Sequence, residues 1–101
     1  FRKGRETLRE AELDELEGAD IIMVKPALAY MDVISDVAEH SSVPVACYNV
    51  SGEYSMIKAA AEKGMVDEQG IVMETMYAFA RAGASIIISY HTREIFEKGW
   101  L

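Results

Sequence analysis

A lysine follows directly on a run of four apolar residues, Ile21 to Val24, and is itself followed by Pro26. A run that is apolar at every position is typical of a strand covered on both faces, as in a parallel sheet. An amine at the end of such a strand begins beside a dry core, where burial disfavours the charged ammonium and favours a neutral amine that attacks a ketone. The alternative is a lysine that extends its charged end into solvent. We expect Lys25 to lie in a pocket, where its amine would be a candidate for Schiff-base formation.

Hydroxyl groups stand at the ends of the other two apolar runs. Tyr48 ends one run, Ser51 lies in the turn that follows it, and Tyr90 comes directly after the other. In a strand-to-helix turn, Ser51 either donates to a bound anion or caps the helix. The two tyrosines are either site residues or core aromatics with satisfied hydroxyls. His91 is a further candidate, as a general base or as a structural residue.

Helices and strands alternate along the chain, which positions these residues. We predict strands at 21–24, 43–48 and 85–89, and helices at 6–17, 31–39, 54–63, 68–82 and 92–101. Such alternation implies parallel strands joined by right-handed crossovers. The segments 18–25 and 83–90 also echo each other, since each begins with Gly-Ala and continues into an apolar run, as in a repeated βα unit. The strands are therefore expected to be neighbours in chain order, with Lys25, Ser51 and Tyr90 at one end.

The expected fold class is α/β, as about three βα units of a (β/α)8 TIM barrel. A barrel needs eight strands and about 250 residues, so three strands cannot close one. Residues 1–101 are accordingly expected to form a partial TIM-barrel domain from a longer enzyme. In such a barrel the carboxyl ends of the strands surround one mouth, where active sites form.

Composition excludes several other classes of function. The net charge of −7 argues against nucleic acid or an anionic membrane as a partner. No apolar run approaches the roughly 20 residues that span a bilayer, and the cytoplasm is the default compartment. The single cysteine, Cys47, excludes an internal disulfide and is expected to be a buried small hydrophobe. The sequence has no glycine-rich phosphate loop, no zinc-type ligand spacing and no nucleophile elbow.

Three segments, in the right order and spacing, resemble the porphobilinogen synthase (5-aminolevulinate dehydratase) family. They are Met23-Val24-Lys25-Pro26-Ala27, the segment from Tyr48 to Met56, and the segment from Arg81 to Tyr90, with Arg5-Glu6-x-Leu8-Arg9-Glu10 upstream. The resemblance covers nearly the whole chain and places it in the C-terminal part of that family. It implies a homo-octameric barrel lyase of tetrapyrrole (heme) biosynthesis, which condenses two 5-aminolevulinate molecules into porphobilinogen. It implies no organic cofactor, but zinc or magnesium or both.

The resemblance also implies roles for single residues. Lys25 corresponds to the lysine that forms the Schiff base with the first substrate molecule. Ser51 and Tyr90 match residues that hold the carboxylate of that substrate, and Tyr48 matches a tyrosine that faces the second. Glu10 matches an acidic residue that some members use for an allosteric magnesium ion.

Other features of the family have no counterpart in this sequence. A second active-site lysine, the catalytic metal ligands and the arginines for the second carboxylate all belong to earlier parts of the family's sequence. Residues 1–4 also depart from the family pattern. The chain alone is therefore expected to be inactive. Two alternatives to the dehydratase remain, another class I Schiff-base aldolase barrel and a catalytically inert barrel fragment.

Overall fold

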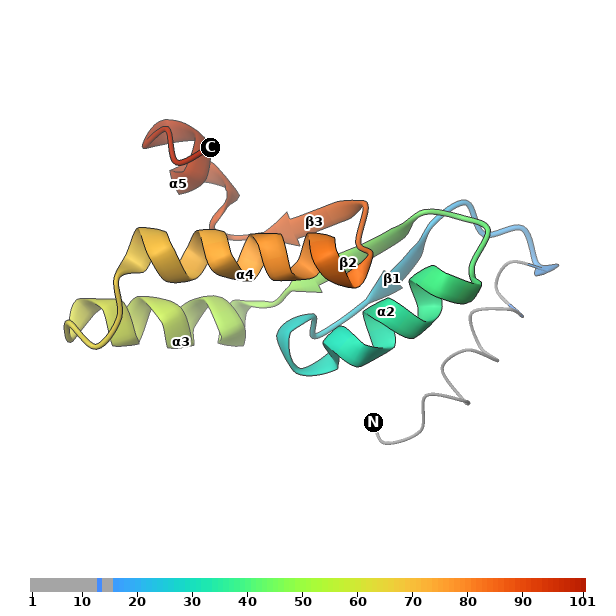
Figure 1. The fold of residues 1–101 in the computed structure, drawn as a ribbon, viewed down its shortest axis with the longest axis horizontal. Coiled ribbons are helices and arrows are strands. Elements are labelled where there is room, and N and C mark those ends of the chain that lie inside the picture. Colours follow the sequence, from blue (N-terminus) through green and yellow to red (C-terminus); the bar gives the residue numbers. More distant parts are fainter. Residues whose placement is uncertain (1–12, 14–15) are drawn as a thin grey trace.

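The computed structural model describes Leu13 and residues 16–101. Three short strands alternate with helices in these residues (Figure 1). The elements are β1 (Ile22–Val24), the 3-10 helix η1 (Leu28–Tyr30), α2 (Met31–His40), β2 (Val45–Asn49), α3 (Ser51–Glu62), α4 (Glu68–Ala82), β3 (Ile86–Ser89) and α5 (Thr92–Glu97). The helix predicted at 6–17 lies almost wholly outside the described residues.

The three strands form one parallel sheet in the order β1-β2-β3, which confirms the prediction of neighbouring strands in chain order. Met23 of β1 pairs with Ala46 of β2, which pairs in turn with Ile86 of β3. Because all three strands run the same way, the residues that follow them gather at one end of the sheet.

One face of the sheet carries the main core. Helices α2 and α4 lie over this face (Figure 1), and side chains that alternate along the strands pack with residues of both helices. The fully buried members include Cys47, Ile34 and Phe79, so the expectation for the cysteine is confirmed. A second, smaller cluster joins α3, α4 and α5 around Ile57, Val72 and Ile95.

The opposite face of the sheet is open. Ile21 and Met23 are 50% and 49% exposed, and Ile86 and Ile88 are 39% and 42% exposed. These residues alternate with the core-facing ones, as the pleat of a strand requires. Four large apolar side chains on one uncovered face are what a sheet shows when the layer that packs against it is absent.

Local signals set most of the helix ends. The side chain of Asp67 accepts a hydrogen bond from the amide of Gly70 at 2.9 Å, which confirms the predicted N-cap of α4. Gly83 ends α4 with a φ of 121°, a backbone conformation that favours glycine. Gly18, at the same place in the other copy of the echo, has a φ of 96°. The repeated Gly-Ala pair therefore marks the same turn into a strand twice.

Some boundaries differ from the predicted ones. β2 begins at Val45 and not at residue 43, since Pro44 has no amide hydrogen for the sheet. α3 begins at Ser51, three residues earlier than predicted. α5 ends at Glu97 because Gly99, with a φ of 64°, turns the chain. Among the described residues, no helix is long and apolar enough to cross a membrane.

Candidate active site

Lys25 stands directly after β1, at the carboxyl end of the sheet. The alternation along Ile21, Met23 and Lys25 puts it on the open face, and its side chain is exposed. The predicted pocket around Lys25 is therefore wrong for this chain. The physical reason is the open face itself, because nothing in the described residues covers that side of the sheet.

Tyr48 and Tyr90 come together on the same open face. Their hydroxyl oxygens are 3.0 Å apart and share a hydrogen bond, and their ring centroids are 6.3 Å apart. This hydrogen bond is the main cause that raises the pKa of Tyr48 above its ordinary value, and partial burial is a smaller one. The two tyrosines line a small pocket of about 240 Å³ with Ile88 and Ser89. One hydroxyl of the pair donates to the other, which leaves the second with its hydrogen for a bound anion, as the sequence predicts for Tyr90.

Ser51 is the first residue of α3 and is exposed. Val50 occupies the N-cap position, and no side chain caps this helix. The alternative that Ser51 is a helix cap is therefore wrong. Its hydroxyl makes no hydrogen bond within the described part of the chain, so it is free to donate to a ligand. Its predicted part in binding a carboxylate stays a prediction.

The loop after Lys25 is held against the end of β2 and the first turn of α3. The amide of Ala27 donates to the carbonyl of Tyr48 at 3.0 Å, and the amide of Leu28 donates to the carboxylate of Glu53 at 2.9 Å. A pocket of about 540 Å³ lies beside this loop, bounded by residues that are mostly apolar. Its lining comprises Pro26, Leu28, Ala29, Val50, Gly52, Glu53 and Met56. The pocket thus lies between Pro26, which follows Lys25, and Gly52, which follows Ser51.

His91 is fully buried just beyond Tyr90. Neither ring nitrogen has a hydrogen-bond partner, and the ring packs on Tyr54 with centroids 4.6 Å apart. Burial is the main cause that lowers the pKa of His91. A neutral, enclosed imidazole without a partner does not reach the open face, so the structural alternative for His91 fits better than the general base.

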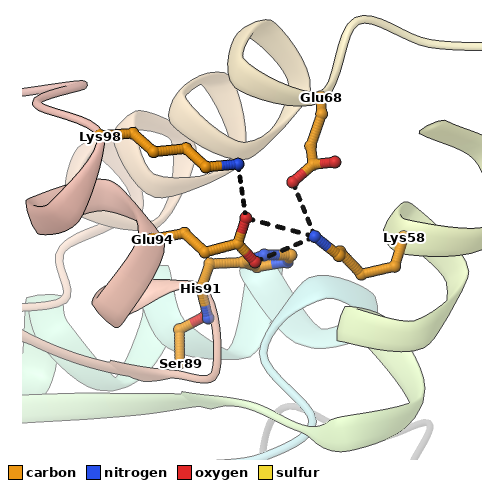
Figure 2. A network of polar contacts seen from close by, with 6 residues as sticks. All are labelled: Lys58, Glu68, Ser89, His91, Glu94 and Lys98. Atoms are coloured by element: carbon orange, nitrogen blue, oxygen red, sulfur yellow. Dashed lines mark hydrogen bonds and ion pairs between the residues drawn. The ribbon is translucent and has the colours of Figure 1, made fainter. Parts of the chain in front are cut away.

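Beside His91, Lys58 joins three helices through an ion network, as Figure 2 shows. Its ammonium group lies 2.8 Å from Glu68 of α4 and 2.9 Å from Glu94 of α5. These hydrogen bonds raise the pKa of Lys58 well above its ordinary value. The hydrogen bond from Lys58 is the main cause that lowers the pKa of Glu94 to about 2. The network fastens α5, and with it the segment that carries Tyr90, to the helical layer.

Metal binding finds no support in the described part of the chain. Glu10, the predicted magnesium ligand, lies outside the described residues. Among residue 13 and residues 16–101, no three histidine, cysteine, aspartate or glutamate side chains gather as a metal site would require. The described residues therefore do not fit a catalytic metal.

Sequence reasoning missed two groups of buried or paired charges. Glu53 was not singled out, yet it is 5% exposed and bonds to Asn49, which is fully buried. The spacing of four residues between these two was the available signal, since a strand end followed by a helix start can bring such a pair together. Lys58 was also missed, and its partners are too far away in the sequence to be found from spacing.

In barrel-type α/β enzymes the active site forms at the carboxyl ends of the parallel strands, which is where this chain carries a lysine and two tyrosine hydroxyls. Residues 1–98 match the family model described as delta-aminolevulinic acid dehydratase. The chain belongs to this family.

Several relatives of known identity support the assignment. The chain is 59% identical over 90 residues to the delta-aminolevulinic acid dehydratase of Synechococcus elongatus, and 56% identical over 90 residues to that of Staphylococcus aureus. These 90 residues are 89% of this chain and 28% of each relative. The chain therefore spans less than a third of the length of these relatives.

A solved structure confirms the fold. The delta-aminolevulinic acid dehydratase (porphobilinogen synthase) of Toxoplasma gondii, in complex with the reaction product porphobilinogen, superposes with a TM-score of 0.93 at 48% identity. The match covers 95% of this chain and 27% of that one. The predicted α/β class is thus confirmed, as three parallel strands that match a fragment of this enzyme.

Proposed function

We propose that the chain is the C-terminal part of a (β/α)8 barrel enzyme that condenses two 5-aminolevulinate molecules into porphobilinogen. The observation that carries the proposal is the position of Lys25, at the carboxyl end of β1 on the same sheet face as the Tyr48–Tyr90 pair. Membership of the dehydratase family supports it. In a closed barrel that face points into the interior, so the remaining strands would enclose the amine that is exposed here.

Lys25 would supply the nucleophile. Its neutral amine adds to the ketone carbon of one 5-aminolevulinate, and loss of one water from the adduct leaves a carbon–nitrogen double bond. The bound ketone carbon is then held at a fixed point above β1. Proximity of this kind accelerates the later carbon–carbon and carbon–nitrogen bond formation with the second molecule.

The hydroxyl groups would bind and orient the substrates. Ser51 and Tyr90 donate to the carboxylate of the molecule attached to Lys25, and Tyr48 faces the second molecule. Tyr48 and Tyr90 share a hydrogen bond at 3.0 Å. When Tyr90 donates its hydrogen to the carboxylate, Tyr48 donates to Tyr90, and this hydrogen bond keeps the hydroxyl of Tyr48 oriented. Ser51 and Tyr90 are both neutral donors, so together they can bind one carboxylate without a positively charged side chain.

The remaining features belong to the proposed parent protein as a whole. Its catalytic metal, zinc or magnesium, would be held by residues outside the described part of this chain, and Glu10 would bind an allosteric magnesium ion. The parent would assemble as a homo-octamer in the cytoplasm. The 101-residue chain alone would be inactive, because the second lysine and the metal ligands are not in it.

The test is chemical trapping in the full-length protein that contains this chain. Borohydride reduction in the presence of 5-aminolevulinate, followed by peptide mass spectrometry, should place the adduct on Lys25. Lys25→Ala should abolish both the adduct and porphobilinogen formation. Lys63→Ala, which removes an exposed lysine at the far end of α3, is the matched control and should change neither. A major adduct on another lysine in the unaltered protein would refute the assignment.

A further inference from the structure

A chain of buried and partly buried hydrogen bonds joins the carboxyl ends of β2 and β3 to the segment that follows β1. Glu53 accepts from the side-chain amide of Asn49 at 2.7 Å, and the Asn49 carbonyl oxygen accepts from the hydroxyl of Ser89 at 2.8 Å. At its ends, Glu53 also accepts from the amide of Leu28 at 2.9 Å, and Ser89 accepts from the amide of His91 at 3.1 Å. We call Glu53, Asn49 and Ser89 the buried polar chain.

The direction of every bond in the buried polar chain is fixed. Both partners of Glu53 are N–H donors, so both of its carboxylate oxygens accept. The Asn49 nitrogen must then face Glu53, which leaves its oxygen to face Ser89. Asn49 is fully buried and Glu53 is 5% exposed, so water cannot replace a lost partner without disturbing the packing.

Each member of the buried polar chain adjoins a residue of the proposed site. Asn49 follows Tyr48 directly, and Ser89 precedes Tyr90 directly. Glu53 lies two residues after Ser51 and holds the loop that leaves Lys25. Since neighbouring residues of a strand point to opposite faces, the site residues face the open side while the buried polar chain lies beneath them.

We propose that Glu53, Asn49 and Ser89 are positioning residues that set the distances between the amine of Lys25 and the hydroxyls around it. This inference rests on the proposed function and adds to it the group that fixes the geometry. These residues touch no reacting atom. They act through the backbone of three strand ends, where a misplacement of about 1 Å can cost about 100-fold in rate.

The fixed bond directions allow a sharp test by polarity reversal in the full-length enzyme. Asn49→Asp alone sets two carboxylates against each other at the 2.7 Å contact. Glu53→Gln alone sets the new amide nitrogen against one of the two donors. In the double variant the new amide donates to the new carboxylate, and the amide of Leu28 and the hydroxyl of Ser89 keep their acceptors. Size and shape are nearly unchanged throughout.

The measured quantities are kcat, KM and Tm, with Glu74→Gln as control for the same chemical change on the exposed surface of α4. We expect kcat to fall about 100-fold in each single variant and to return to within tenfold of wild type in the double variant. The control should match wild type. Single variants that melt earlier but keep their kcat would overturn the inference, since they would show a purely structural role.

The double variant decides the matter if the single variants do not fold. A folded double variant within tenfold of wild-type kcat supports the positioning role. A double variant that is unfolded, or folded with less than a hundredth of wild-type kcat, overturns it, because the reversed bonds then fail to replace the original ones. The unaltered enzyme separates the two proposals. If it forms no porphobilinogen, the proposed function fails, whereas normal activity with unaffected variants rejects only the positioning role.

Discussion

Ser51→Ala separates ligand binding from helix stability, because the hydroxyl of Ser51 has no structural role within the described residues. Ser51 is exposed, it is not the N-cap of α3, and it makes no hydrogen bond in the described residues. In the full-length enzyme we therefore expect the substitution to weaken substrate binding and to leave the fold intact.

The expected size follows from the type of bond. A hydrogen bond from a hydroxyl to a charged carboxylate contributes about 1.5–3 kcal/mol, and each 1.4 kcal/mol is about tenfold in affinity. KM for 5-aminolevulinate should rise about tenfold to 100-fold. Loss of a true N-cap would instead cost about 1 kcal/mol and lower the Tm, by less than the roughly 2–4 °C expected for a protein of 150–250 residues, since the relatives of this chain are longer than that. Because Ser51 caps nothing, we expect no such fall in Tm.

The assay is steady-state kinetics together with thermal melting of the same preparations. Ser55→Ala is the matched control, since it makes the same change at another exposed position of α3. It should alter neither KM nor Tm. A lower Tm with unchanged KM in Ser51→Ala would refute the reasoning, because it would support a capping role for Ser51 and reject its role in binding the carboxylate.

Four further substitutions test the packing around the site in the full-length protein. Lys58→Met removes two partly exposed ion pairs worth up to about 1 kcal/mol each, so the free energy of unfolding should fall by up to about 2 kcal/mol. The pKa of Glu94 is lowered from 4.5 to about 2, so its stabilising effect is present above pH 4.5 and is lost as the pH falls toward 2. Denaturation midpoints measured across this pH range should show the loss. In Lys58→Met the loss across the same range should be smaller, because the main cause of the lowered pKa is gone. His91→Phe should raise Tm, most of all below about pH 6.5, where the lowered pKa of His91 means that the unfolded state gains the proton first; equal Tm changes at pH 5.5 and pH 8 would contradict this. Gly83→Ala should destabilise more than Gly18→Ala, since both have positive φ but only the former places a new methyl carbon 2.5 Å from a side chain of α2; equal losses in chemical denaturation would argue against a steric cost.

The order of the strands could be predicted because each apolar run is short and continuous. Ile21 to Val24 and Ile86 to Ile88 have no polar alternation, and helical segments separate them from the run that ends at Tyr48. Right-handed crossovers then leave few topologies to choose from. Both ends of α4 could also be predicted, because Asp67 and Gly83 act through contacts within a few residues of themselves.

The environment of Lys25 could not be predicted from its own neighbourhood. Its exposure depends on whether a second layer covers the sheet, which residues 21–26 do not encode. The burial of Glu53 could not be predicted for the opposite reason. A glutamate at the start of a helix is exposed by default, and only its two donors, in other segments of the chain, make its burial tolerable.

The open face of the sheet has a consequence for how the proposed barrel reaches its working state. Each strand pairs with the next one in sequence, so this part of the sheet needs no contact across long loops and can form early. Covering Ile21, Met23, Ile86 and Ile88 requires ring closure with strands far away in the sequence, which is slower because the entropy of loop closure must be overcome first. Until then this apolar face can bind other unfinished chains and aggregate. Lys25 belongs to the same face, so imine formation would appear only with the last folding step, and its onset in a refolding experiment would time barrel closure.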